Sequence, residues 1–118
     1  MRVVQLKKRA EFVKMTQHGR RYVTPSFVLQ MMPREKDEVA IGYTASKKVG
    51  GAVQRNRAKR RLRGLFDQTI RLNPDFQYKG EGKGVTMVLI ARRAILDKPF
   101  AKIKADFENI LRELSCDV

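Results

Sequence analysis

The feature that most constrains the fold is a run of eight residues, VTMVLIAR (85–92), that is nearly all apolar. A strand with one face in water alternates apolar and polar side chains, whereas a strand covered on both faces is apolar throughout. The run therefore predicts a central strand in a sheet that has packing on both faces. The chain has 118 residues, of which 42% are apolar, which is enough for one modest core. We expect a single domain over residues 1–118.

Two earlier segments are predicted to be strands of the same sheet. Residues 21–32 and 39–45 are rich in apolar and β-branched side chains and are bounded by turn signals. In the second segment Val39, Ile41 and Tyr43 fall on one face. The charged turn PREKDE between the two segments indicates an antiparallel hairpin.

Three other segments are predicted to be helices. Residues 6–18 are followed by a glycine that suits the end of a helix, and residues 53–72 are stopped by an Asn-Pro pair. The third helix has Pro99 in its first turn, a position that tolerates a missing N–H. Its apolar residues recur at helical spacing: Phe100, Ile103, Phe107, Ile110, Leu111 and Leu114.

The order of these elements defines a fold class. Residues 73–84 contain one proline and three glycines and are predicted to be an exposed loop. The remaining elements follow the order αββαβα, and strand 39–45, helix 53–72 and strand 85–92 have the order of a β-α-β unit. We therefore expect an α+β single-domain sandwich, with helices packed on one sheet.

Positive charge is concentrated in two blocks of the sequence, within a formal net charge of +14. Residues 39–66 contain eight Lys/Arg and no acid, and residues 1–21 contain seven Lys/Arg and Glu11, so the blocks carry +8 and +6. Such segregated charge gives a surface potential that attracts polyanions. Nucleic acid and an anionic membrane are the default partners of so basic a chain.

Three features argue against a membrane or exported protein. No apolar run approaches the roughly 18 residues of a transmembrane helix. The N-terminal MRVVQLKKRAEF lacks the apolar core of a signal peptide. Cys116 is the only cysteine, which excludes an internal disulfide and suits the reducing cytoplasm. We therefore expect a cytoplasmic protein with no membrane partner.

The helix predicted over 53–72 carries two opposed stripes. The apolar stripe comprises Ala58, Leu62, Leu65, Phe66 and Thr69, and the polar stripe comprises Asn56, Lys59, Arg60 and Arg63. Like charges four residues apart repel, and positive charge is unfavourable near a helix N-terminus. Because two local rules are broken together, the polar stripe indicates a functional site.

The composition of this stripe favours phosphate as its ligand. A solvated helix face usually mixes both signs of charge, but no acid precedes Asp67 in the predicted helix. Between residues 55 and 63 there are five arginines and one lysine, and guanidinium binds phosphate oxygens bidentately. Two roles stay open for Asn56, which either caps backbone groups or binds a polar group or hydrated metal ion of the ligand.

The stretch from Ser46 to Arg63, SKKVGGAVQRNRAKRRLR, resembles the signature of the protein subunit of bacterial ribonuclease P. The R-N-R core lies at 55–57 and is followed by Lys59-Arg60 and Arg63. Three more matches bring the resemblance to nearly the whole chain: LKKRAEF (6–12), His18-Gly19 and SFVL (26–29).

The resemblance implies both a fold and an activity. Family members have an α+β fold of the ribosomal protein S5 domain 2 type, with a left-handed β-α-β crossover. They bind a large catalytic RNA and the 5′ leader of precursor tRNA, with one protein per RNA. The RNA cleaves off the leader with Mg²⁺, held mainly by the RNA, to give mature tRNA 5′ ends. No catalytic side chain and no metal ligand is therefore expected in this chain.

The resemblance and the charge pattern together assign nine residues to the catalytic RNA: Lys47, Lys48, Arg55, Asn56, Arg57, Lys59, Arg60, Arg61 and Arg63. The leader is expected in a cleft between the sheet and the first helix, with Lys8, Arg9, Phe12, Thr16 and Phe27 as candidate contacts.

The first helix leaves two roles open for Phe12. The expected core stripe of this helix is Leu6, Ala10 and Val13, which leaves Phe12 exposed to stack on an unpaired base. In the alternative, Phe12 and Met15 belong to the core.

The sequence departs from the family pattern in two places. Thr16 stands where many members have a second aromatic residue, which puts base stacking there in doubt. Gly51 stands where many members have asparagine, so any contact from that side chain is missing.

Three other classes of protein fit parts of the pattern. A ribosomal or other structural RNA-binding protein shares the composition, and only the extended signature argues against it. A DNA-binding regulator needs a second helix immediately before the basic one, and none is predicted. A membrane-surface binder needs the apolar stripe that the core requires.

Overall fold

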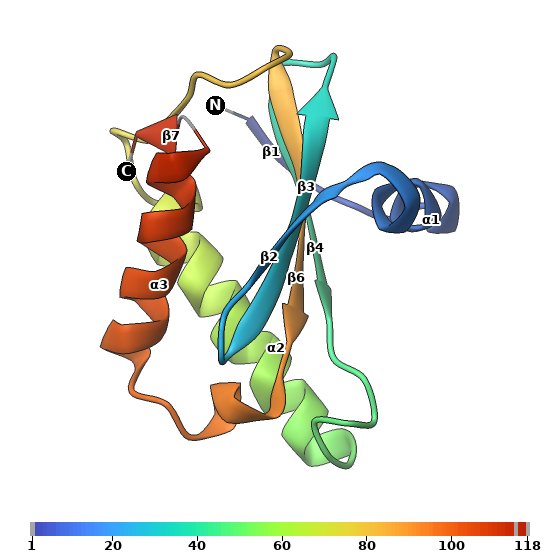
Figure 1. Cartoon of the computed structure of the whole chain (residues 1–118), viewed down its shortest axis with the longest axis vertical. Helices are drawn as coiled ribbons and strands as arrows, with labels where there is room; N and C mark the ends of the chain where they lie inside the picture. Colours follow the sequence, from blue (N-terminus) through green and yellow to red (C-terminus); the bar gives the residue numbers. More distant parts are fainter. Residues whose placement is uncertain (1, 115, 118) are drawn as a thin grey trace.

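The computed structural model describes residues 2–114 and 116–117 of the chain, which Figure 1 shows as a ribbon. Its elements in chain order are β1 (Arg2–Gln5), α1 (Arg9–His18), β2 (Arg20–Val23), β3 (Phe27–Arg34), β4 (Glu38–Thr44), α2 (Ala52–Phe66), a π-helical turn (Asp67–Arg71), β5 (Gln77–Tyr78), β6 (Gly84–Ala91), a 3-10 turn (Arg93–Leu96), α3 (Phe100–Glu113) and β7 (Cys116–Asp117). The side chains of Cys116 and Asp117 lie outside the described part.

The apolar strand β6 is the centre of the five-stranded sheet, whose order is β1-β4-β6-β3-β2. It runs parallel to β4 and antiparallel to β3. Val85, Met87 and Leu89 of β6 join the core under α2 and α3, whereas Val88 joins the core under α1. The prediction of a central strand that is covered on both faces is therefore confirmed.

The predicted hairpin between the segments 21–32 and 39–45 is wrong. β3 and β4 follow one another in the chain but do not pair, because β6 lies between them. Val85 of β6 is opposite Pro33 of β3 on one side and Val39 of β4 on the other. A strand that is apolar on both faces buries more area at the centre of a sheet than at its edge, so β6 separates the two arms of the turn.

The segment 21–32 forms two strands rather than one. β2 and β3 pair antiparallel around a tight turn in which the Thr24 N–H donates to the Phe27 carbonyl over 2.9 Å. The Phe27 N–H in return donates to Thr24 Oγ1 over 3.0 Å. Pro25 sits inside this turn, where its missing N–H is not needed. The strand β1 and the short β5–β7 pair are also unpredicted, because such short segments show no readable periodicity.

The helices cover both faces of the sheet (Figure 1). α1 packs on one face, over a small core that includes Met15, Ala40 and Val88. α2 and α3 pack on the other face, over a larger core in which Phe27 and Phe107 meet edge to face with ring centroids 5.8 Å apart. The predicted single α+β domain, a mixed sheet packed by helices, is thereby confirmed.

The predicted β-α-β unit is present as β4, α2 and β6, whose strands are adjacent and parallel. The left-handed sense of this crossover stays a prediction of the family resemblance. The α-helical part ends at Phe66, and the π-helical turn continues it to Arg71, close to the predicted end. Within the described ranges, no helix is long and apolar enough to cross a membrane.

The predicted core stripe of α1 is wrong for Ala10 and Val13, whereas Leu6 is buried in the core as expected but precedes the helix. The helix begins at Arg9 rather than at Leu6, because Leu6 is still extended and its N–H donates to the Ile41 carbonyl over 2.9 Å. Met15 is therefore the fully buried residue of α1, and Val13 is 45% exposed.

Candidate nucleic-acid interface

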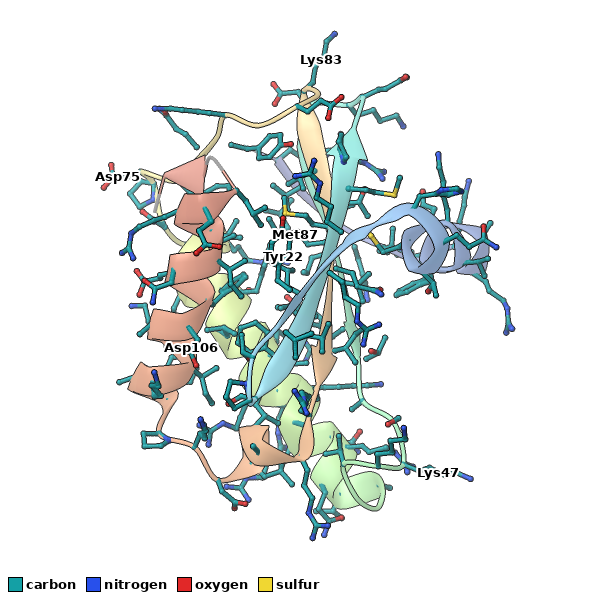
Figure 2. The ribbon with its side chains drawn as sticks, in the orientation of Figure 1. Tyr22, Lys47, Asp75, Lys83, Met87 and Asp106 are labelled. Carbon is teal, nitrogen blue, oxygen red and sulfur yellow. The ribbon has the colours of Figure 1, made fainter. Side chains whose placement is uncertain are left out.

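The loop that leads into α2 is fixed by its own backbone. Gly50 has φ of +147°, a conformation that favours glycine. The Val49 side chain is buried, and its N–H donates to the Ser46 carbonyl over 3.0 Å. Lys47 and Lys48 are exposed on this loop. Figure 2 shows Lys47 projecting from the end of the molecule at which α2 begins.

α2 has the two opposed stripes that the sequence predicts. Ala58, Leu62, Leu65 and Phe66 are fully buried, and Thr69 of the π-helical turn continues this side. On the polar side Asn56, Arg60 and Arg63 are exposed and Lys59 is half-buried. The first turn contains no acid and no side-chain cap. The partial positive charge of the helix N-terminus therefore adds to the charge of the nearby cations.

Three cations of α2 are engaged with the protein itself. Arg55 Nη1 donates to the Gly50 carbonyl over 3.3 Å. Arg57 Nη2 donates to the Leu96 carbonyl over 3.1 Å, and Arg61 Nη2 donates to the Lys98 carbonyl over 2.6 Å. The last two bonds tie α2 to the end of the 3-10 turn and to the segment that joins this turn to α3. Arg57 and Arg61 therefore serve first to position α2.

The other polar residues of α2 have no such engagement. Among the described residues, Asn56, Lys59 and Arg60 make no side-chain hydrogen bond or ion pair with another residue. The capping role that stayed open for Asn56 is thus not seen in the described part of the chain. These three side chains are available to a ligand.

Arg63 is held by an aromatic ring rather than by an acid. Its guanidinium lies 5.5 Å from the centroid of the Tyr43 ring, which in turn meets Phe66 edge to face. Asp67, the first acid of the helix, pairs with Arg71 over 3.0 Å. Burial raises the pKa of the Tyr43 hydroxyl well above its ordinary value, and the Asp67 charge raises this pKa further. Tyr43 therefore stays neutral beneath Arg63.

α1 presents a second basic surface, on the opposite face of the sheet (Figure 1). Lys8, Arg9 and Thr16 are exposed, and Phe12 is half-buried. The Phe12 ring lies against Gly42 of β4, where an added Cβ would come within 2.8 Å of two ring carbons. Met15, which is fully buried, is a core residue. Phe12 combines a core contact with an exposed part that can stack.

Thr16 does not reach beyond its own helix. Its hydroxyl donates to the Phe12 carbonyl over 3.1 Å, one turn earlier. This bond occupies its only proton, and the oxygen remains an acceptor.

Comparison with known proteins identifies the family. A family model described as Ribonuclease P matches residues 1–115. The chain belongs to the ribonuclease P protein family. The resemblance seen in SKKVGGAVQRNRAKRRLR is thereby confirmed.

Relatives and solved structures agree with this assignment. The Ribonuclease P protein component of Gluconacetobacter diazotrophicus is 41% identical over 113 residues, which cover 95% of this chain and 91% of the relative. That of Nitratiruptor sp. is 39% identical and covers 95% and 93%. The RNase P protein of Staphylococcus aureus is 26% identical, with a TM-score of 0.71 and coverage of 92% and 93%. The RNase P protein of Thermotoga maritima, at 23% identity and a TM-score of 0.73, supports the fold alone.

One predicted contact of this ribonuclease P family member is wrong. Phe27 was expected to touch the leader, but its side chain is fully buried and packs on Phe107. Phe27 is the first residue of β3 and points toward α2 and α3, because side chains alternate along a strand.

The same alternation shows two surface residues that sequence reasoning missed. Val28 and Gln30 of β3 point toward the α1 face, and they pair with Val23 and Arg21 of the edge strand β2. Arg21 and Val23 are exposed on this edge strand, where they also line a hollow beside α3 together with Asp106 and Glu113. Detecting them required the division of 21–32 into two strands. Arg92 is fixed at the hairpin, where Nη1 donates to the Thr24 carbonyl over 3.0 Å.

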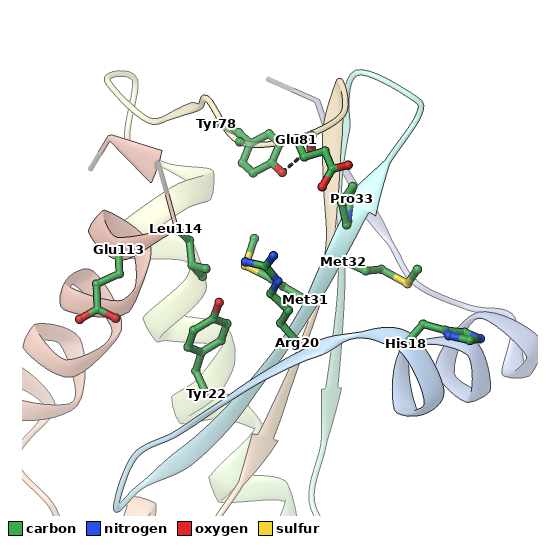
Figure 3. Close-up of a pocket in the computed structure, with 11 residues that line it drawn as sticks. His18, Arg20, Tyr22, Met31, Met32, Pro33, Tyr78, Glu81, Glu113 and Leu114 are labelled. Carbon is green, nitrogen blue, oxygen red and sulfur yellow. Dashed lines mark hydrogen bonds between the residues drawn. The ribbon is translucent and has the colours of Figure 1, made fainter.

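A cavity of about 290 Å³ lies between β2, β3, the loop 78–81 and the end of α3 (Figure 3). Tyr22 and Met31 line one part of it, and the Tyr78 hydroxyl donates to the Glu81 carbonyl over 2.5 Å. His18 and Arg20 line the part of the cavity that lies toward α1. Because two acids, Glu81 and Glu113, outnumber the one arginine, Arg20, in its lining, the cavity is unfavourable for phosphate. Across the described ranges, no three His, Cys, Asp or Glu side chains form a group that could hold a metal ion.

Proposed function

We propose that this chain is the protein component of a ribonuclease P ribonucleoprotein, the endoribonuclease that removes the 5′ leader from precursor tRNA. In this proposal the RNA carries out cleavage, and the protein binds both that RNA and the leader. The observation that carries the proposal is the polar face of α2. Lys59 and Arg60 have no protein partner there among the described residues, and α2 contains no acid.

The α2 face would bind the catalytic RNA through its phosphates. Arg60 and Lys59 are the direct contacts, since no hydrogen bond or ion pair within the described chain competes for them. Arg57 and Arg61 hold the helix against the segment 96–98. Arg63 is oriented by Tyr43, and Lys47, Lys48 and Arg55 extend the positive surface around the helix N-terminus.

The leader would bind on the other face of the sheet, beside α1. Lys8 and Arg9 supply positive charge, and the exposed part of Phe12 offers a stacking surface. A single-stranded leader fits such a surface because its bases are free to stack. Since α1 and α2 pack on opposite faces of one sheet, one protein per RNA would hold leader and catalytic RNA in a fixed relation.

We assign the Mg²⁺ of the reaction to the RNA, as the family resemblance implies. The protein would then act through charge. Its cations would lower the repulsion between two RNAs, a task that otherwise falls to Mg²⁺. The need for the protein should therefore be greatest at low Mg²⁺.

The test is reconstitution with a bacterial ribonuclease P RNA at low Mg²⁺ and near-physiological salt, with 5′ processing of a precursor tRNA as the readout. The proposal expects clear stimulation by the protein, which shrinks as Mg²⁺ is raised. RNA binding without any stimulation of processing would instead favour a structural RNA-binding protein.

A further inference from the structure

A groove of about 620 Å³ runs beside the polar face of α2, between this helix and the segment that joins the 3-10 turn to α3. Arg57, Arg60 and Arg61 form its α2 wall, and Asp97 and Phe100 lie on the opposite side. Gly64 belongs to the α2 wall and lies nearest to Phe100. The groove is shallow and open to solvent.

Gly64 keeps the groove open. An added Cβ at this position would have only one atom within 4.0 Å outside the helix itself, Cε2 of Phe100. The space over Gly64 is therefore large enough for a side chain, and it is bordered by an aromatic ring. Glycine is less favourable than alanine inside a helix, so no requirement of the free protein explains the hollow.

The α2 wall is rigid. Arg57 and Arg61 each donate to a backbone carbonyl across the groove, of Leu96 and Lys98 respectively. Arg61 is half-buried, and its Nε is fully buried without a hydrogen-bond partner among the described residues. These bonds fix two planar guanidinium groups, and such planes are surfaces on which nucleic-acid bases stack. Arg60, which has no such bond among the described residues, is exposed on the same wall.

The charges of the groove set the orientation of a ligand. Three arginines and Lys98 face one acid, Asp97, so the groove attracts an anion. A phosphate is favoured at Arg60 and disfavoured at Asp97. The side of Phe100 and Asp97 instead suits a base, because the ring offers an apolar surface and the carboxylate accepts from an amino group.

We propose that this groove takes one unpaired nucleotide of the bound RNA, with its phosphate at Arg60 and its base over Gly64 against Phe100. The proposal rests on the proposed function, because it requires α2 to lie on RNA. It adds a base-binding subsite to a helix that otherwise contacts phosphates.

The test fills the groove and measures affinity for a bacterial ribonuclease P RNA over a range of salt concentrations. Gly64→Leu places a side chain in the hollow without removing a cation. It should leave the Tm unchanged or higher and weaken binding about five- to a hundredfold, the contribution of one stacked base. The slope of log Kd against log salt should stay the same, since no phosphate contact is lost. Ala105→Leu is the matched control, because Ala105 is exposed on α3 and lies outside the groove.

Three results would overturn the proposal. The first is an unchanged affinity in Gly64→Leu, and the second is an equal loss of affinity in Ala105→Leu. The third is a loss in Gly64→Leu that comes with a salt slope lower by about one unit, which would mean that the site binds phosphate only. Gly64→Ala, which adds one methyl group, gives the same test with a smaller loss should leucine disturb the fold. Wild-type protein that binds no RNA would refute the proposed function itself. An intact wild-type affinity with an unaffected Gly64→Leu would refute only the groove.

Discussion

At the scale of single residues, the arginines of α2 divide into those that hold the protein together and those that face outward. Arg57 and Arg61 donate to backbone carbonyls of the segment 96–98. Arg60 has no partner within the described chain. This division was not readable from the sequence, because a helical wheel shows the direction of a side chain but not the loop that packs beside it.

For Arg60 we expect a loss of affinity without a loss of stability. Arg60→Ala should weaken RNA binding and lower the slope of log Kd against log salt by about one unit, as the loss of one phosphate contact requires. The Tm should stay unchanged, because surface substitutions change stability by about 0.5 kcal/mol or less. An unchanged slope would show that Arg60 touches no phosphate.

Arg61 should behave in the opposite way. Arg61→Ala removes a 2.6 Å bond to the Lys98 carbonyl from a half-buried site, and we expect it to lower the free energy of unfolding by roughly 1–3 kcal/mol. The salt slope should be nearly unchanged. Denaturant unfolding and RNA titration of the same sample separate the two effects. A slope lower by one unit at full stability would make Arg61 an RNA ligand after all.

Tyr43 gives a pH-dependent prediction. Its hydroxyl is buried without a hydrogen-bond partner in the described chain, and burial raises its pKa above the ordinary value of about 10. Because the folded state then binds this proton more tightly than the unfolded state, stability falls as pH rises above about 10. Tyr43→Phe should lose less free energy of unfolding above pH 10 than the wild type does. At pH 7 its free energy of unfolding should equal that of the wild type or be up to roughly 1 kcal/mol higher. Identical pH profiles would contradict the account.

At the scale of elements, α1 tests the leader surface. Phe12→Ala should weaken binding of leader-bearing precursor tRNA by about fivefold or more, as the loss of one stacked base predicts, and leave mature tRNA unaffected. It should also lower stability by about 1–2 kcal/mol, since the ring is half-buried against Gly42. Val13→Ala on the same helix, at a residue that is 45% exposed, is the control. Equal losses for both RNAs would make Phe12 a core residue only.

The periodicity within single elements could be predicted from the sequence, whereas the pairing between strands could not. The apolar run of β6 and the stripes of α2 and α3 are strong signals, because burial imposes their periodicity directly. The position of β6 between β3 and β4 is not local information, so the charged turn was mistaken for a hairpin. The core stripe of α1 was misplaced for a more local reason: it was anchored on Leu6, which is extended and therefore does not mark the buried face of the helix. The predicted leader contact of Phe27 was wrong because the sequence alone did not show which face of the sheet this residue of β3 points to.

At the scale of the whole molecule, the positive charge lies mainly in two blocks, residues 1–21 and 39–66, which include α1 and α2 on opposite faces of the sheet. Figure 2 shows Lys47 and Lys83 at opposite ends of the protein, and the cations of α2 lie toward the end that carries Lys47. The net charge of +14 alone would attract any polyanion. We propose more narrowly that the polar face of α2 is the surface that binds the catalytic RNA.

The most direct test of this claim compares two double variants that remove the same charge from the two ends. Lys59→Gln with Arg60→Gln neutralises two cations of α2, and Lys36→Gln with Lys83→Gln neutralises two exposed cations of the loops at the other end. Stimulation of precursor tRNA processing at low Mg²⁺ is measured for both with the same ribonuclease P RNA. We predict that the α2 variant loses most of the stimulation and about two units of salt slope, whereas the other variant keeps both. Equal losses in the two variants would contradict the account, because bulk charge rather than the α2 face would then explain binding.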